Sequence, residues 1–137
     1  MRVLAATSTA VVLAVLAAQS AGAAASWLSF QTPSRNIACS YHSGILRCEI
    51  GGGLELLPPK PASCSLDWGY GLKLRMTGRA YVLCAGDTIR QPDAPVLAYG
   101  STWRRAGLSC VSRTTGLTCR NAAGHGFFLS RERWRRF

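Results

Sequence analysis

The sequence contains little that would support metal or acid–base chemistry. Only six of its 137 residues are aspartate or glutamate, and only two are histidine. So few acids give little basis for the pair of catalytic carboxylates that a glycoside hydrolase needs. The six cysteines lack the short C-x2–4-C spacing of zinc sites, so we expect no metal and no cofactor.

Long apolar runs are also missing. The chain opens with Met1-Arg2, continues with an interrupted apolar stretch to residue 18, and then carries small residues up to Ala25. A membrane-spanning helix needs about 20 apolar residues, and no cysteine that could carry a lipid follows closely. This order predicts a signal peptide over residues 1–25, cut before Ser26, and a secreted protein that could associate with the cell wall. The alternative is an uncleaved anchor.

No window has the apolar period of an amphipathic helix. Short apolar and alternating segments lie between glycine and proline clusters, which predicts a single all-β domain over residues 26–137. We expect a small disulfide-stapled sheet, sandwich or partly open barrel made of hairpins. The expected hairpins cover about 36–50, 72–84 and 107–121. Further strands are expected near 27–32, 96–99, 103–105 and 127–130, and residues 66–71 are expected to form a loop.

An even number of cysteines in a short exported chain predicts a disulfide framework. Eight residues separate Cys39 from Cys48. Pairing residues symmetrically about Ser43-Gly44 places these cysteines opposite each other and Tyr41 opposite Leu46. Directly opposed residues can lie about 4.5 Å apart, which is within disulfide range.

The same spacing separates Cys110 from Cys119, about a midpoint at Thr114-Thr115, where we expect Gly116 to lengthen the loop. Cys64 and Cys84 then pair by elimination. A shift of 71 positions aligns the two eight-residue units in the shared pattern apolar-x-Cys-x6-Leu-x-Cys. This pattern suggests duplicated hairpin units at residues 37–48 and 108–119, unless the matches arose by chance.

Five segments of the chain form distinct motifs: F-x-T-P-S-x-N-I-x-C (30–39), C-x-x-D-x-G (64–69), C-x-G-D-T (84–88), Y-G (99–100) and G-L-T-C-x-N-x-x-G-H-G-F-x-L-S-R (116–131). With these motifs the chain resembles a family of exported proteins of unknown function that is common in high-GC Gram-positive bacteria. The resemblance implies secretion and a disulfide-bonded β domain, and it implies no activity. Arg35 departs from the glycine that the family often has at this position of the turn.

Positive charge gathers in the C-terminal part of the chain. Residues 104–137 hold eight arginines and a single acid, Glu132. Guanidinium groups match phosphate and carboxylate, and neighbouring aromatics add a stacking surface. The candidate binding residues in the tail are Arg131, Arg133, Trp134, Arg135 and Arg136.

These residues predict a secreted, non-enzymatic binding protein. Its ligand would be an anionic polysaccharide, a teichoic-type polymer or a lipid headgroup of the cell envelope. The alternative is a solvated basic surface with Trp134 covering the core. No nucleic-acid-binding motif appears, so we expect no such ligand.

Trp68 and His125 are two further candidates. Trp68 in an exposed loop would offer a sugar platform, whereas a buried indole would fill the core. His125, between two glycines, could be the general base of a small hydrolase if an acid or nucleophile lay nearby. Gly-His-Gly is more typical of a turn, and Asp87 in Gly-Asp-Thr is expected to bond its own backbone in another. A further alternative is an inhibitor of an extracellular enzyme that uses a disulfide-braced loop.

Overall fold

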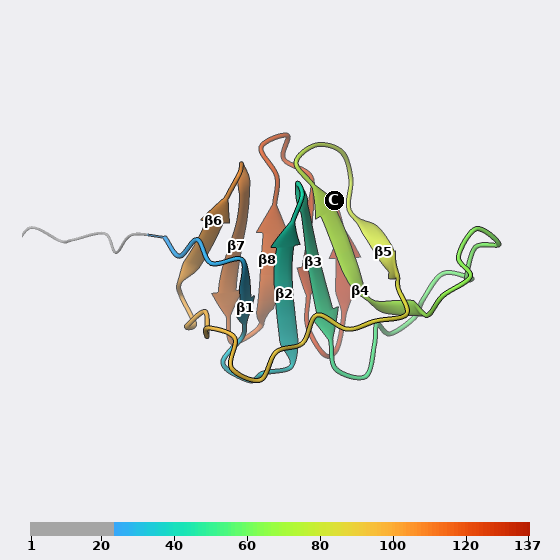
Figure 1. Cartoon of the computed structure of the whole chain (residues 1–137), viewed down its shortest axis with the longest axis horizontal. Helices are drawn as coiled ribbons and strands as arrows, with labels where there is room; N and C mark the ends of the chain where they lie inside the picture. Colours follow the sequence, from blue (N-terminus) through green and yellow to red (C-terminus); the bar gives the residue numbers. More distant parts are fainter. Residues whose placement is uncertain (1–23) are drawn as a thin grey trace, which may run out of the picture.

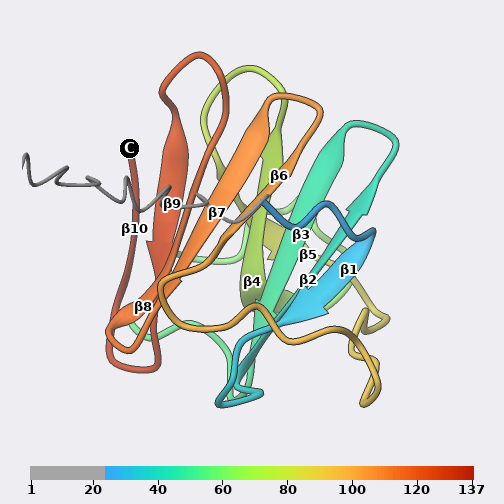
Figure 2. The same cartoon turned by 90° about the vertical axis from the view of Figure 1, so that its left-hand side faces the viewer.

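The computed structural model describes residues 24–137, which form two antiparallel five-stranded sheets packed face to face (Figures 1 and 2). The all-β prediction is confirmed, and the structure selects the sandwich among the three forms expected. Most of the predicted signal peptide lies outside the described residues. No helix within residues 24–137 is long and apolar enough to cross a membrane. The strands are β1 (Ser29–Gln31), β2 (Ile37–His42), β3 (Ile45–Ile50), β4 (Trp68–Arg75), β5 (Tyr81–Cys84), β6 (Thr102–Arg105), β7 (Leu108–Arg113), β8 (Gly116–Arg120), β9 (Gly126–Leu129) and β10 (Trp134–Arg136).

Each sheet is a meander in which strands that follow one another in sequence are also neighbours in space. The first sheet has the order β1-β2-β3-β4-β5 and the second β10-β9-β8-β7-β6. Counted along the sequence, the two cysteine hairpins, β2–β3 and β7–β8, are therefore the second and third strands of their respective sheets. The predicted hairpins at 36–50, 72–84 and 107–121 are confirmed with small shifts in their ends.

The β2–β3 turn forms as the sequence predicts. Ser43 and Gly44 have φ angles of 47° and 79°, and a two-residue hairpin loop of this kind needs positive φ at both positions. Cys39 lies opposite Cys48, with their Cα atoms 4.1 Å apart and a disulfide between them.

The other two predicted disulfides are also present. Cys110 and Cys119 are opposed in β7 and β8, and Cys64 joins Cys84 at the end of β5. The loop between β7 and β8 is shorter than expected. Gly116 pairs with Arg113 as the first residue of β8, so only two residues form the turn.

The core lies between the sheets, and its largest fully buried side chain is Trp103 of the edge strand β6. Its ring centroid is 5.3 Å from that of Phe30, so the two sheets meet through these side chains. The indole Nε1 donates a hydrogen bond to the Trp27 carbonyl at 2.8 Å, which satisfies its polar group inside the core. The other large, fully buried side chains of the core are Phe127, Leu46, Leu72, Leu74, Leu97, Leu108, Leu117 and Leu129.

Three local predictions are wrong. Residues 68–71 belong to β4 rather than to a loop, and residues 96–99 make only an isolated bridge from Val96 to Gln31. The tail residues 134–136, for which no strand was expected, form β10 at the edge of the second sheet. The glycines explain the first error, because a Cβ at Gly71 would lie 2.0 Å from the Cys48 carbonyl oxygen. Gly71 therefore marks a close approach between strands rather than a loop.

The connection between β5 and β6 crosses the outer face of the first sheet near one end of its strands (Figure 1). Arg47 of β3 forms ion pairs with Glu49 and with Asp87 of this connection, so Asp87 does more than bond its own turn. Glu49 also accepts hydrogen bonds from Thr88 Oγ1 and the Ile89 amide, and it is only 4% exposed. The outer face of the second sheet carries no comparable covering segment within residues 24–137.

Candidate functional site: an arginine-rich sheet face

The outer face of the second sheet is built by simple strand alternation. In β8, Leu117 and Cys119 are fully buried in the core, so Thr118 and Arg120 point outward. In β7, Cys110 and Ser112 are buried and their neighbours point outward in the same way.

The strand register arranges these outward side chains in rows. In one row Arg104 lies beside Ser109, which lies beside Arg120. Strands are about 4.8 Å apart, so the backbones of Arg104 and Arg120 lie roughly 10 Å apart. We call this surface the basic face; its arginines are Arg104, Arg113, Arg120, Arg133 and Arg135, all of them exposed.

Two phenylalanine rings lie among these arginines. The Arg120 guanidinium carbon is 4.4 Å from the centroid of Phe137, and that of Arg135 is 5.3 Å from the same ring. Arg133 lies 5.3 Å from the centroid of Phe128. Each such contact contributes about 0.5–1 kcal/mol at an exposed site and orients the guanidinium group.

Phe128 in turn lies against a glycine. A Cβ at Gly116 would come within 2.6 Å of the Phe128 ring, and the φ of Gly116 is 148°. The absence of a side chain at this position therefore makes room for the ring. The guanidinium groups therefore stack on aromatic rings along the outer face of this sheet.

The basic face has no carboxylate among its outward side chains. Within residues 24–137 the ion pairs are those of Arg47 with Glu49 and Asp87, on the other sheet. The roughly 10 Å between the backbones of Arg104 and Arg120 is close to one Debye length at physiological ionic strength, about 8 Å. The potentials of the arginines therefore add over the face and favour a ligand with several negative charges.

The structure divides the predicted tail residues between two surfaces. Arg133 and Arg135 lie on the basic face, and Arg131 lies in the β9–β10 turn at its end. Trp134 packs against the core and donates from Nε1 to the Glu55 carbonyl at 2.6 Å. Arg136 donates to the Ala80 carbonyl at 3.3 Å, so it also lies away from the basic face.

Three arginines of the basic face were not predicted: Arg104, Arg113 and Arg120. A signal for two of them is present in the sequence. If both cysteines of the Cys110–Cys119 bridge point into the core, alternation places Arg113 and Arg120 on the opposite face.

Trp68 belongs to β4, and His125 lies in the turn between β8 and β9. Trp68 is partly buried against the core, and its Nε1 donates to the Pro58 carbonyl at 3.1 Å, so it is no exposed platform. The backbone of His125 is bonded to Asn121, whereas its ring makes no hydrogen bond or ion pair within the described residues. The same part of the chain contains no group of three metal-binding side chains.

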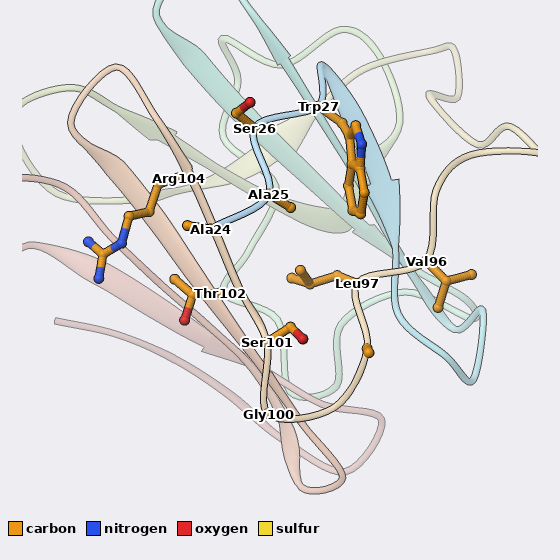
Figure 3. Close-up of a pocket in the computed structure, with 11 residues that line it drawn as sticks. Ala24, Ala25, Ser26, Trp27, Val96, Leu97, Gly100, Ser101, Thr102 and Arg104 are labelled. Carbon is orange, nitrogen blue, oxygen red and sulfur yellow. The ribbon is translucent and has the colours of Figure 1, made fainter. Parts of the chain in front are cut away.

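A cavity of about 830 Å³ lies between the segment 24–27 and residues 96–104 (Figure 3). Mostly small side chains line it, together with Trp27, Val96 and Leu97. The Arg104 side chain at its rim points away from the other lining residues (Figure 3). The backbone of Ala25 bonds to β6 here, donating to Thr102 and accepting from the Arg104 amide. No charged groups converge in this cavity.

Comparison with known proteins gives a family but no activity or ligand. Residues 9–137 match the model of a family described as being of unknown function. No curated protein matches the chain, and no solved structure does.

Proposed function

The chain belongs to DUF6636, a family of unknown function, and we propose that it is a secreted, non-enzymatic protein that binds an anionic polymer of the cell envelope on its basic face. The observation that carries the proposal is the gathering of five exposed arginines on one sheet face. Among residues 24–137, no strand of this face has an outward carboxylate side chain and no segment covers it. Three disulfides are compatible with an oxidising, extracellular location.

The geometry of the face favours an extended polymer over a small ion. The arginines belong to four strands and to the turn before β10, so their charges are spread in two directions across the sheet. Guanidinium groups held against Phe128 and Phe137 keep their N–H edges free for bidentate bonds to phosphate or carboxylate. A chain of repeating anions can engage several of them at once, which raises the apparent affinity.

The ligand class follows from this chemistry and from secretion. Teichoic-type phosphodiesters and acidic polysaccharides both present anions at regular intervals along an extended chain. Anionic lipid headgroups present the same charges in a plane, so vesicles of anionic and of neutral lipid form a separate arm of the test.

The test compares two double variants of equal charge. The face variant carries Arg120→Gln and Arg135→Gln, and the control carries Lys60→Gln and Arg79→Gln, both exposed residues outside the face. With polygalacturonate and with polyphosphate as probes, we expect the face variant to bind about 10–100-fold more weakly and the control to change little. Binding of the wild type should weaken steeply with added salt. Equal losses in both variants, or binding insensitive to salt, would overturn the proposal.

One observation favours a second function, inhibition of an extracellular enzyme. Leu56 is 96% exposed in the 51–67 connection. Trp134 bonds to the Glu55 carbonyl just before Leu56, and Trp68 bonds to the Pro58 carbonyl two residues after it. A loop braced in this way loses little entropy on binding a partner.

To test this second function, increasing amounts of the protein are added to leucine-preferring extracellular proteases and to lysozymes, and the residual enzyme activity is measured. Inhibition that Leu56→Ala removes would support it. Full enzyme activity at a large excess of the protein would count against it.

A further inference from the structure

A second polar site adjoins the basic face at one end of the sandwich. Three turns meet there: the β1–β2 turn, the β7–β8 turn and the β9–β10 turn, together with Tyr99 of the β5–β6 connection. They enclose a cavity of about 260 Å³, which we call the turn pocket. We propose that it holds one sugar unit of the anionic polymer, an inference that rests on the proposed function.

Part of the pocket wall is fixed by its own hydrogen bonds. Thr32 Oγ1 accepts from the Ile37 amide at 3.3 Å, and Ser34 Oγ accepts from the Asn36 amide at 3.3 Å. Ser130 Oγ accepts from the Arg133 amide at 3.2 Å and donates to the Arg133 carbonyl. These bonds hold the turns in place and make the pocket preorganised.

A second group of lining side chains takes no part in the hydrogen bonds that hold the turns in place. These side chains make no hydrogen bond and no ion pair to other described residues, so their polar atoms are available to a ligand. They are Tyr99, Arg113, Thr114, Thr115, Arg131 and Glu132.

The mixture of donors and acceptors indicates the class of ligand. Glu132 accepts hydrogen bonds and repels a bare anion, so it suits a hydroxyl group. Arg113 and Arg131 suit a carboxylate or phosphate. The threonine hydroxyls both donate and accept. Tyr99 is 45% exposed and offers a ring face for the apolar side of a sugar. Together these groups fit a sugar ring that bears an anionic substituent.

The turn pocket is continuous with the basic face. Arg113 and Gly116 pair across β7 and β8, line the pocket and also lie on that face. Ser130 and Arg131 extend the wall toward Arg133. A polymer that follows the edge of the face therefore meets the pocket without leaving the surface of the protein.

Residues from three of the sequence motifs also line the pocket. Thr32, Ser34 and Asn36 come from T-P-S-x-N, and Tyr99 comes from Y-G. Ser130 and Arg131 come from the end of the longest motif. Segments that are distant in sequence thus place their polar residues around a single cavity.

The test uses two probes of similar charge. Oligogalacturonate carries sugar hydroxyls and carboxylates, whereas short-chain polyphosphate carries anions alone. The pocket variant carries Tyr99→Ala and Glu132→Gln, both at exposed positions, and the face variant Arg120→Gln, Arg135→Gln serves for comparison. Circular dichroism and thermal unfolding establish that each variant is folded.

We expect the pocket variant to bind oligogalacturonate about tenfold more weakly, and to bind polyphosphate no more weakly than the wild type does. The face variant should lose affinity for both probes. Equal oligogalacturonate affinity in wild type and pocket variant, or wild-type binding of polyphosphate alone, overturns the sugar site and leaves the basic face intact. Failure of the wild type to bind either probe overturns the proposed function itself.

Discussion

Gly126 and Phe137 exchange two backbone hydrogen bonds, from the Gly126 amide at 2.9 Å and from the Phe137 amide at 3.1 Å. This pair extends the β9–β10 ladder beyond Arg136. It also holds the Phe137 ring at the position where Arg120 and Arg135 lie against it. One edge of the basic face therefore depends on a buried glycine in β9.

Replacing Gly126 with alanine should destabilise the domain. The added Cβ would lie 1.9 Å from the Cys119 carbonyl oxygen, so β8 and β9 would have to separate. We expect a loss of roughly 1–3 kcal/mol in the free energy of unfolding, measured by urea denaturation. Gly86→Ala is the matched control, because its Cβ would meet only the Leu66 side chain, at 3.4 Å. Equal stability of the two variants would contradict the close approach of the strands.

Asn121 should matter more to stability than its neighbour His125. Its Nδ2 donates to the carbonyls of Arg75 and Gly78, and its Oδ1 accepts from the amides of Ala123 and His125. Asn121→Ala leaves several of these groups unpaired in a buried place, which should cost about 2–3 kcal/mol. His125→Ala should cost less than about 0.5 kcal/mol, because the ring makes no hydrogen bond among the described residues. Thermal unfolding of both variants gives the comparison, and the reverse order would show that the ring has a partner.

The sequence predicts the hairpins and disulfides well because both follow local rules. Symmetry about Ser43-Gly44 is enough to oppose Cys39 and Cys48, and the same reasoning applies to Cys110 and Cys119. Elimination then leaves Cys64 to pair with Cys84. Arg35 in the β1–β2 turn has a φ of 58°, a conformation that glycine adopts without strain.

The basic face could be predicted only in part. The tail SRERWRRF has no apolar alternation, so nothing local marks it as a strand, and β10 forms because it pairs with β9. That pairing sends Trp134 inward and Arg135 outward, which splits a group of residues that looks uniform in sequence. Arg104 joins the face only through the register of β6 on β7. Such long-range register depends on packing and is not visible in any short window.

The ion pair between Arg47 and Asp87 should make stability depend on acid pH. The hydrogen bond from Arg47 and its positive charge lower the pKa of Asp87 from its ordinary value of 3.8. A carboxyl whose pKa is lower in the folded state stabilises the fold fully above the unfolded value and ceases to do so as pH falls through the folded value. The difference in melting temperature between wild type and Asp87→Asn should therefore be present at pH 6 and shrink below about pH 4. A difference that is constant from pH 6 to pH 2.5 would contradict this pairing.

The Cys64–Cys84 bridge should contribute more to stability than either hairpin bridge. It closes a sequence separation of 20 residues, against 9 for Cys110–Cys119, and the entropy that a cross-link removes from the unfolded chain grows with loop length. We expect Cys64→Ser with Cys84→Ser to cost about 3 kcal/mol in urea unfolding. The same variant should become sensitive to limited proteolysis between residues 55 and 63, because that loop would lose its covalent link to β5 and be held mainly by the bonds from Trp68 and Trp134. Cleavage mapped by mass spectrometry to the β7–β8 hairpin instead would show that the bridge stabilises the sandwich as a whole rather than its projecting loop.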